Sequence, residues 1–333
     1  MKKLINDPYA VVDEMLDGFI AAHGNLVRRT AAHKRGVVRV DAPRQGKVGV
    51  LIGGGSGHKP AFIGYVGPGG VDGVAVGNVF ASPPPAPILE VTRAINGGSG
   101  VLYSYGNYAG DVMNFDMAAE MAGEEGIEVR TVLVTDDVAS APKGQEADRR
   151  GIAGDFFVFK IAAAAAEEGS DLATVEALAR QANSATRSMG VALSACTVPA
   201  AGRPTFSLGE DEMEIGLGIH GEPGLRRGPL ESADSVATAL VEHILADMPL
   251  ARGDELAVLV NGLGATPYME LYILYRKVSA LLAEGGVSIH RAYVGEYVTS
   301  LEMAGASVSI MNLDATLARL LDAPADCPMF TQV

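Results

Sequence analysis

Apolar positions along the first 134 residues follow two alternating periods. Between residues 11 and 22 they recur at helical spacing, at Val12, Met15, Leu16, Phe19 and Ile20, which predicts a helix. Short apolar runs of strand length then alternate with helical segments. Strands are predicted at 48–52, 73–76, 101–105 and 129–134, and helices at 88–95 and 115–122. This alternation predicts an α/β sheet with helices on both faces.

A second α/β pattern follows two long helical segments, at 151–168 and 172–188. It contains predicted strands at 191–198, 213–219, 255–260, 287–294 and 307–311, and predicted helices at 232–247, 269–284 and 314–321. We therefore expect two α/β domains, each a mixed or mostly parallel sheet flanked by helices. The expected domains are residues 1–187 and residues 188–333.

Composition narrows the class of protein. Apolar residues make up 48% of the chain and charged residues 20%, which indicates large buried cores rather than disorder. The formal net charge of −14 argues against binding to nucleic acid or to an anionic membrane. Cys196 and Cys327 lie far apart in the sequence, which predicts a reducing compartment. With no signal peptide and no membrane-spanning run in the sequence, we expect a cytoplasmic protein.

The glycine-rich segment Gly53–His58 follows the apolar run 48–52 directly. Four glycines and Ser56 at the end of a parallel strand leave backbone N–H groups accessible to a polar ligand. Ligands bind at this edge of open α/β sheets, and His58 adds a group that can transfer protons. The segment is therefore interpreted as a catalytic loop, although a tight turn would also use glycine.

Two further polar residues lie in short segments that contain glycines. Asp111 follows the predicted strand 101–105 and is placed at the start of a helix, where the positive end of the helix dipole favours a carboxylate. It could equally be a plain N-cap. His220 lies in Gly218-Ile219-His220-Gly221, at the end of a β-rich run, and could equally be a histidine satisfied within a turn.

Several common motifs are absent from the sequence. In the glycine loop His58 stands where a P-loop has glycine before its lysine, and neither a dinucleotide-binding fingerprint nor a hydrolase elbow is complete. No paired His or Cys spacing predicts a zinc site. We therefore expect the chain to bind no metal and no nucleotide by itself.

Taken in order, these segments resemble the substrate-binding subunit of dihydroxyacetone kinase, the DhaK family. The matching stretches extend over essentially the whole chain. They begin at Gly53 (GGGSGHKPAFIGYVG), Gly77 (GNVFASPPP), Gly106 (GNYAGDVMNFDMA), Val134 (VTDDVAS), Gly151 (GIAGDFFVFKIAAAAAEEG), Glu214 (EIGLGIHGEPG), Leu259 (LVNGLGATPYMEL) and Ser300 (SLEMAGASVSIMNLD).

The resemblance implies a role for each candidate residue. His220 would attack a ketose carbonyl and hold the sugar as a covalent hemiaminal. Asp111 would be the general base on the terminal hydroxyl, and His58 would hydrogen-bond that hydroxyl or its neighbour. Gly55 and Ser56 would offer backbone contacts to the sugar.

The resemblance also implies partners. The phosphate would come from a separate L-type subunit that carries ADP or ATP with magnesium, since the sequence ends at Val333 without a helical nucleotide domain. Members of this family form homodimers, so a homodimer is expected. The source of the phosphate, ATP or a phosphotransferase-system protein, is left open.

The chain departs from the family pattern beside the substrate. The family reads G-H-E-P-A-H, and here Lys59 and Phe62 replace the glutamate and the second histidine. The family reads K-N-Y-T-G-D, and here Gly106 and Ala109 replace the lysine and the threonine. In the family that lysine reaches the substrate, so glycine removes a donor and leaves room at the substrate. We therefore expect a ketose larger than dihydroxyacetone, such as the tetrulose erythrulose or a branched ketose.

A ketose-binding co-activator of a transcription regulator is the alternative to a kinase. Some relatives of the subunit have become such sensors and do not catalyse. A sensor could keep His220 for binding but would have no need of Asp111 as a base. Retention of both Asp111 and His58 favours the enzyme.

Overall fold

The computed structural model describes residues 2–333 and divides into two compact units. The glycine-loop unit comprises Lys2–Val134, Phe157–Ala182 and Arg319–Val333. The His220 unit comprises Thr135–Phe156 and Asn183–Ala318. Each unit is thus built from separate stretches of chain, and this division differs from a single boundary between residues 187 and 188. It differs because the chain passes into the His220 unit at Thr135, returns for two helices, and ends in the glycine-loop unit.

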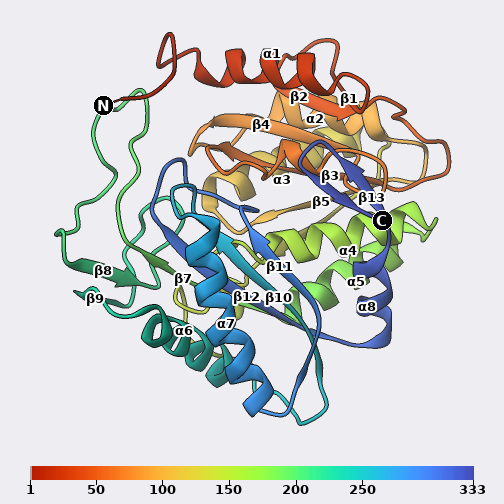
Figure 1. Cartoon of the computed structure of the whole chain (residues 1–333). Helices are drawn as coiled ribbons and strands as arrows, with labels where there is room; N and C mark the ends of the chain where they lie inside the picture. Colours follow the sequence, from red (N-terminus) through yellow and green to blue (C-terminus); the bar gives the residue numbers. More distant parts are fainter. Residues whose placement is uncertain (1) are drawn as a thin grey trace. The chain divides into compact units, whose positions relative to one another are not determined.

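A six-stranded mixed sheet forms the centre of the glycine-loop unit (Figure 1). Its strand order is β1-β2-β4-β3-β5-β6. Strand β3 is parallel to β4 and β5, and β5 is parallel to β6, whereas β2 is antiparallel to both of its neighbours. The strands are β1 (Val27–Arg29), β2 (Gly36–Arg39), β3 (Gly49–Ser56), β4 (Gly73–Val79), β5 (Val101–Gly106) and β6 (Val129–Val134). The carboxyl ends of β3 and β5 therefore meet at one edge of the sheet.

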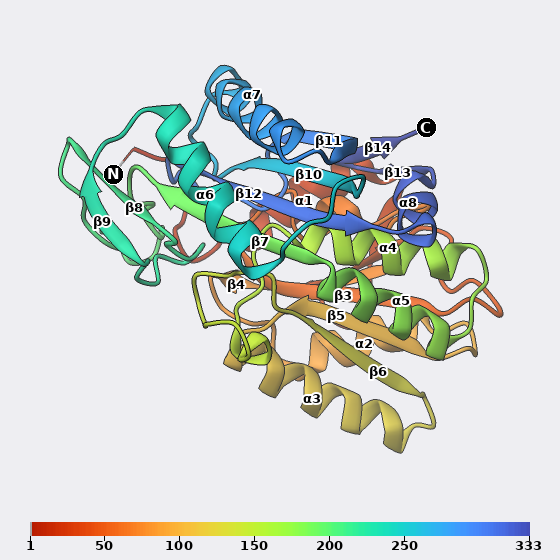
Figure 2. The ribbon, with the colours of Figure 1, turned by 90° about the horizontal axis from the view of Figure 1, so that it is seen from below.

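Helices cover both faces of this sheet, with α2 and α3 on one side and α4 and α5 on the other (Figure 2). Buried side chains of α2 and α3 pack on Val38, Leu51, Ala75 and Tyr103 of the sheet. The helices of the unit are α1 (Val11–His23), α2 (Pro85–Ile95), α3 (Ala109–Glu124), α4 (Asp155–Glu167) and α5 (Leu172–Ser184), with one 3₁₀ turn, η1 (Ile63–Tyr65). The hairpin of β13 (Ala325–Cys327) and β14 (Phe330–Gln332) completes the unit.

A buried cluster of charges ties the last turn of α4 to this sheet. Arg39 of β2 is 1% exposed and donates to Asp72 at 3.2 Å and to Glu167 of α4 at 2.8 Å. Lys47 donates to the other oxygen of Asp72 at 2.5 Å. Charges are buried in proteins only when they are paired in this way. The pairing gives a physical reason for α4 to belong mostly to the glycine-loop unit.

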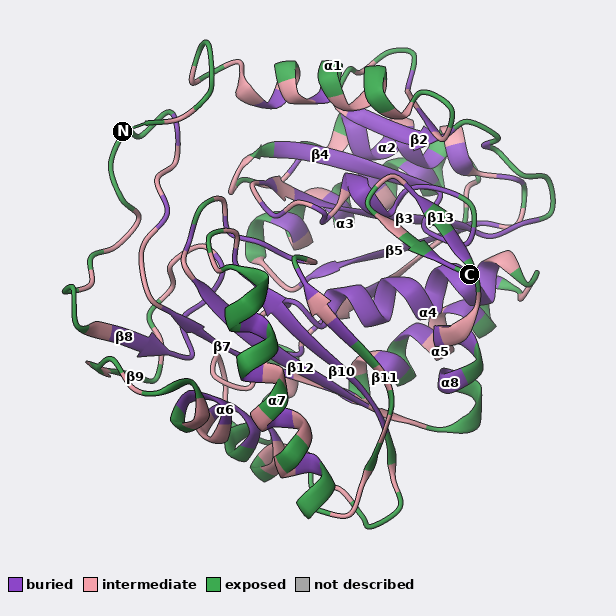
Figure 3. Ribbon diagram, viewed as in Figure 1, coloured by how far each residue is buried: buried purple, intermediate pink, exposed green. Residues whose placement is uncertain are grey.

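The His220 unit contains a second six-stranded sheet, ordered β11-β10-β12-β7-β8-β9. Only β10 and β11 are parallel, so this sheet is mixed and mostly antiparallel. Its strands are β7 (Thr186–Ala192), β8 (Glu212–Ile215), β9 (Arg226–Pro229), β10 (Glu255–Gly262), β11 (Ser288–Gly295) and β12 (Gly305–Leu313). Helices α6 (Ala233–Asp247) and α7 (Tyr268–Glu284) pack on it, η2 (Glu146–Asp148) precedes α4, and α8 (Ala315–Asp322) follows β12. Figure 3 shows most central strands of both sheets buried.

The predicted helices and strands are largely confirmed, but some of their bounds differ where tertiary contacts determine the end of an element. The helix predicted at 232–247 is α6, capped by Ser232, whose side chain accepts from the backbone of Ser235. The helix predicted to reach residue 188 ends at Ser184, because residues 186–192 pair with β12 as strand β7. The strand predicted to reach residue 219 ends at Ile215, because Gly216 turns the chain with a φ of +83°. Among residues 2–333 no helix is long and apolar enough to cross a membrane.

Candidate functional site

The glycine loop is the end of β3 and packs closely on neighbouring backbone. A Cβ atom at Gly55 would lie 2.7 Å from the backbone nitrogen of Ala81, so no larger residue fits there. Gly57 has a φ of +109°, which favours glycine. The Ser56 hydroxyl donates to the carbonyl oxygen of Gly77 at 2.9 Å. Close packing therefore explains part of the glycine pattern, and the Ser56 side chain holds the loop against β4.

Phe62 covers one side of this loop. Its ring would lie 2.6 Å from a Cβ atom at Gly54, and it contacts the ring of Phe159 with centroids 6.0 Å apart. Lys59 lines a cavity of only about 10 Å³ with Gly54 and Gly55. Burial lowers the pKa of the Lys59 ammonium to about 8. Two departures from the family pattern, Phe62 and Lys59, thus lie beside the glycines. Phe62 packs its ring on Gly54, and Lys59 places a largely buried amine there.

His58 is buried, with 2% of its surface exposed. Its ring stacks on Phe80 with centroids 5.1 Å apart, and Phe62 meets it edge-on at 6.4 Å. Phe80 adopts a φ of +55°, a conformation that is unfavourable for a residue with a side chain by about 1–2 kcal/mol. The aromatic contacts fix the imidazole plane at the carboxyl end of β3.

Asp111 is the third residue of α3 and is 9% exposed. The N-cap of α3 is Tyr108, so the interpretation of Asp111 as a plain N-cap is wrong. In the first turn, the positive end of the helix dipole favours a carboxylate. Asp111 thus follows β5, the parallel neighbour of the strand that carries the glycine loop.

Tyr105 of β5 lies within the electrostatic field of this carboxylate. Burial raises the pKa of its hydroxyl well above the usual range, and the charges of Asp116 and Asp111 raise it further. Its ring stacks on Phe115 of α3 with centroids 4.1 Å apart. Among the described residues its buried hydroxyl has no hydrogen-bond partner. The phenol therefore stays neutral at physiological pH and can offer a hydrogen bond at this edge of the sheet.

His220 lies in the loop that follows β8 in the His220 unit. Its side chain is 23% exposed, and its Nδ1 lies 3.0 Å from Oε1 of Glu222. The other oxygen of Glu222 accepts the backbone N–H of His220 at 2.9 Å. Because a carboxylate only accepts, Nδ1 carries the hydrogen, and in the neutral imidazole Nε2 then carries the lone pair. The Glu222 carboxylate therefore fixes the orientation of the His220 ring.

The electrostatics of Glu222 favour this contact. Burial opposes its ionisation, but the hydrogen bond and charge of His220, with a contribution from Arg150, lower the pKa of Glu222 to about 2. Arg150 lies 3.9 Å from Glu222 and donates to Asp137 at 3.0 Å. Burial raises the pKa of Asp137 to about 6, with Arg150 opposing the shift and Asp136 adding to it. Alternating charges thus run from Asp137 through Arg150 to Glu222, which contacts His220.

Sequence reasoning missed Glu222, Arg150 and Asp137. Glu222 stands two residues after His220, so the spacing of a histidine and a carboxylate in one short loop could have identified it. Asp137 precedes η2 and Arg150 lies between η2 and α4, so both are far from His220 in the chain. No local pattern connects them to it.

A Glu222→Gln variant tests the carboxylate. The pKa of Glu222 is about 2 in the folded chain against 4.5 for the ordinary group. The charge therefore stabilises the fold fully above about pH 4.5, and this contribution is lost as the pH falls through about 2. We expect the variant to unfold more easily at pH 7 by about 1–3 kcal/mol and the difference to shrink at pH 3, in urea titrations. Glu210→Gln, an exposed control, should show neither effect; an equal loss at both pH values would contradict the account.

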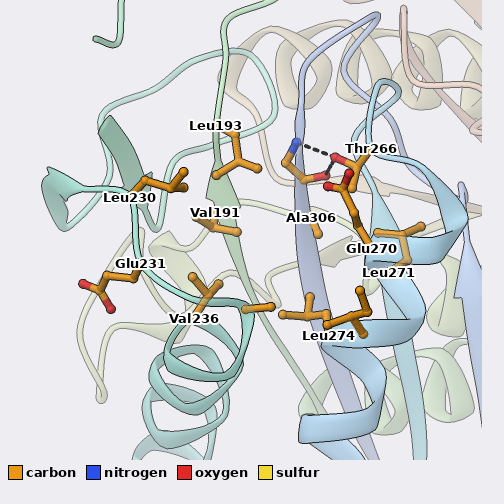
Figure 4. Close-up of a pocket in the computed structure, with 13 residues that line it drawn as sticks. Val191, Leu193, Leu230, Glu231, Val236, Thr266, Glu270, Leu271, Leu274 and Ala306 are labelled. Carbon is orange, nitrogen blue, oxygen red and sulfur yellow. Dashed lines mark hydrogen bonds between the residues drawn. The ribbon is translucent and has the colours of Figure 1, made fainter. Parts of the chain in front are cut away.

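A separate cavity of about 250 Å³ lies between α6 and α7 in the His220 unit (Figure 4). Apolar side chains of both helices and of β7 and β12 line it, including Val191, Val236, Leu271 and Ala306. The hydroxyl of Thr266 accepts from the backbone N–H of Gly305 at 2.8 Å beside it. None of the candidate residues lines this cavity.

The described residues, 2–333, contain no cluster of three or more His, Cys, Asp or Glu side chains that could hold a metal ion. Both cysteines are buried and outside any disulfide. The imidazoles of His58 and His220 and the carboxylate of Asp111 are groups that can support acid–base and nucleophilic chemistry. His58 and Asp111 belong to the glycine-loop unit, and His220 belongs to the other unit.

Comparison with known proteins places these motifs in a family. The family model described as the Dak1 domain matches residues 17–329. The chain is 49% identical over 330 residues to the dihydroxyacetone-binding subunit DhaK of the PTS-dependent dihydroxyacetone kinase 2 of Listeria innocua, covering 99% of each chain. It is 52% identical over 330 residues to the D-erythrulose kinase of Mycolicibacterium smegmatis. The match covers 99% of this chain but 56% of that kinase, so the chain spans just over half of this longer relative.

Solved structures agree with the fold. The dihydroxyacetone kinase of C. freundii, in complex with AMP-PNP and Mg²⁺, matches with a TM-score of 0.90 at 33% identity. The match covers 99% of this chain and 61% of that one. The dihydroxyacetone kinase operon co-activator Dha-DhaQ matches with a TM-score of 0.88 at 32% identity, covering 96% of this chain and 98% of the co-activator. The expected class of two α/β units is confirmed.

Proposed function

The chain belongs to the Dak1 domain family, and we propose that it binds a short-chain ketose covalently and serves as the acceptor-binding part of a ketose kinase. The observation that carries this proposal is the contact of Glu222 with Nδ1 of His220 at 3.0 Å, because it leaves Nε2 as a nucleophile. Relatives named as a dihydroxyacetone-binding subunit and as an erythrulose kinase support the same activity.

In the proposed binding step, Nε2 of His220 attacks the ketose carbonyl carbon. A C–N bond forms, the C–O π bond breaks, and the carbonyl oxygen takes up a proton from water to become a hydroxyl. The imidazolium formed gives up its Nδ1 proton to water through Glu222, so no net proton is consumed. The product is a hemiaminal, which only a carbonyl compound can form. The step therefore selects a ketose against a polyol of the same size.

In the proposed transfer step, the carboxylate of Asp111 accepts the proton of the terminal hydroxyl. The hydroxyl oxygen then attacks the phosphorus, and the bond between that phosphorus and the leaving oxygen of the donor breaks. His58 hydrogen-bonds the hydroxyl or its neighbour, and Gly55, Ser56 and Gly106 supply contacts along the glycine loop and the end of β5. Positioning of this kind dominates phosphoryl transfer.

A nucleotide-bearing L-type subunit or domain is the proposed donor. The described residues show no nucleotide motif and no metal cluster. The relative from Listeria is named as one subunit of a kinase, and the longer C. freundii kinase was crystallised with AMP-PNP and Mg²⁺. Mg²⁺ with ATP or ADP is therefore proposed on the partner. A homodimer located in the cytoplasm is proposed with it, and sedimentation of the purified chain tests the dimer.

A four-carbon ketose such as erythrulose is the proposed substrate. Gly106 stands where the family has a lysine that reaches the substrate, and Ala109 replaces a threonine. The high identity to the D-erythrulose kinase supports a larger acceptor than dihydroxyacetone.

The proposed function is tested by phosphorylation of a panel of three- to five-carbon ketoses with an L-type subunit and Mg·ATP. We expect kcat/KM for erythrulose to exceed that for dihydroxyacetone by about tenfold or more, a difference that one extra group in a pocket can supply. A Gly106→Lys variant should shift the preference towards dihydroxyacetone. Faster turnover of dihydroxyacetone than of every larger ketose would overturn the proposed substrate. No turnover of any ketose would overturn the proposed kinase activity.

A ketose-binding co-activator is the second candidate, because the solved co-activator Dha-DhaQ covers nearly the same chain. The buried Asp111 in the first turn of α3 and the buried His58 favour the kinase. A co-activator would bind ketose through His220 and yield no sugar phosphate in the same panel.

A further inference from the structure

Helix α3 carries apolar side chains on two opposite sides. Phe115, Ala118 and Ala122 are fully buried against the sheet. A second row points to solvent, with Met113 65% exposed, Met117 48% exposed and Met121 37% exposed. These methionines are spaced four residues apart and form one continuous row along the helix. A helix that covers a sheet needs only one apolar face, so the outer row calls for another explanation.

A row of acidic residues runs beside the methionines. Asp116, Glu120 and Glu124 are exposed and are also spaced four residues apart. None of the three forms an ion pair with a cation among residues 2–333. Like charges at this spacing destabilise an isolated helix slightly. A cationic surface of a partner would be attracted by these carboxylates and would offset the repulsion between them.

The outer row begins next to the proposed general base. Asp111 is in the first turn of α3, and Met113 follows two residues later. With a rise of about 1.5 Å per residue, Met121 lies about 15 Å along the helix from Asp111. A stable interface buries about 800 Å² on each protein, a patch roughly 30 Å across. A protein that delivers phosphate to a hydroxyl at Asp111 would therefore cover much of this row.

We propose that these six side chains, the α3 docking face, receive an amphipathic helix of the nucleotide-bearing partner, with apolar side chains flanked by Lys or Arg. Its members are Met113, Asp116, Met117, Glu120, Met121 and Glu124. The inference rests on the proposed function, because it takes the phosphate donor as the occupant. Methionine suits such a surface, since its flexible side chain adapts to a partner that must bind and leave.

The acidic row argues against two other occupants. A second copy docked by this face around a two-fold axis would bring the same acidic row towards itself. An anionic membrane would be repelled by the three carboxylates and by the net charge of −14. A partner helix with apolar side chains flanked by Lys or Arg is the occupant that matches both the methionine row and the acidic row.

Binding of the L-type subunit, loaded with Mg·ADP, tests the proposal by calorimetry with the full chain. Met117→Glu should weaken binding at least about tenfold, and Met269→Glu should stay within twofold. Met269 is the matched control, because it is 74% exposed on α7 outside this face. A triple variant with alanine at 113, 117 and 121 keeps good helix formers and should weaken binding similarly. Glu120→Lys should weaken binding and reduce its dependence on salt.

Ketose binding separates failure of this inference from failure of the proposed function. Each variant should still form the His220 adduct and reach the wild-type kcat when the L-type subunit saturates. Unchanged affinity in Met117→Glu and in the triple variant would overturn the docking face while the kinase stands. A change of oligomeric state without a change of partner affinity would assign the face to a second copy and overturn the proposal. No partner binding by the wild-type chain would overturn both.

Discussion

Asp111→Asn is expected to lower kcat for ketose phosphorylation by about 10³-fold while ketose binding is kept. A positioned general base contributes on the order of 10²–10⁴-fold to a proton transfer. Asparagine has nearly the shape of aspartate but cannot accept the hydroxyl proton. The reaction would then depend on water as the base, and the hemiaminal with His220 would form as before.

Single-turnover assays of Asp111→Asn with saturating L-type subunit measure this effect directly. Asp116→Asn, on an exposed face of the same helix, is the matched control for the transfer step and should retain kcat. If Asp111→Asn turned over within tenfold of the wild type, Asp111 would not be the base. If it lost ketose binding as well, the carboxylate would act in binding rather than in transfer.

His220→Ala is expected to abolish the ketose adduct and to lower kcat/KM by about 10³-fold or more. The physical reason is that covalent attachment replaces a bimolecular encounter by a fixed acceptor. The variant should also lose the discrimination against glycerol, because only the hemiaminal requires a carbonyl. This loss of selectivity separates a covalent role from a merely structural one.

Initial rates with ketose and with glycerol, for the wild type and His220→Ala, test this prediction. His243→Ala is the control, since His243 lies exposed on α6 and hydrogen-bonds the carbonyl of Ala239 within its own helix. Ketose selectivity that survived in His220→Ala would show that His220 does not recognise the carbonyl.

Hydrophobic periodicity predicted most of the elements that carry the candidate residues. Strand β3 and helix α1 appear where apolar spacing predicts them. The short edge strands β1, β9 and β13 were not predicted, because three or four residues carry too little periodic signal. The bounds of β7 were misplaced because pairing with β12 decided them, and pairing between distant segments leaves no local pattern.

The candidate site was predictable where a motif is contiguous. Gly53–Ser56 form the end of β3 and Asp111 follows β5, and the structure makes these two strands parallel neighbours, a pairing that was not predicted. The partners that orient His220 were not predictable in full. Arg150 reaches Glu222, and Asp137 reaches Arg150, only through the folding of distant segments of the His220 unit. Phe62, noted as a departure, proved to pack on Gly54 and Phe159.

The most direct measurement is the ¹³C spectrum of a ketose labelled at its carbonyl carbon and bound to the wild-type chain. The account predicts that the carbonyl signal is replaced by that of a tetrahedral carbon bonded to nitrogen, and that His220→Ala restores the carbonyl signal. Bound ketose with an intact carbonyl in the wild type would contradict the central claim that His220 holds the substrate covalently.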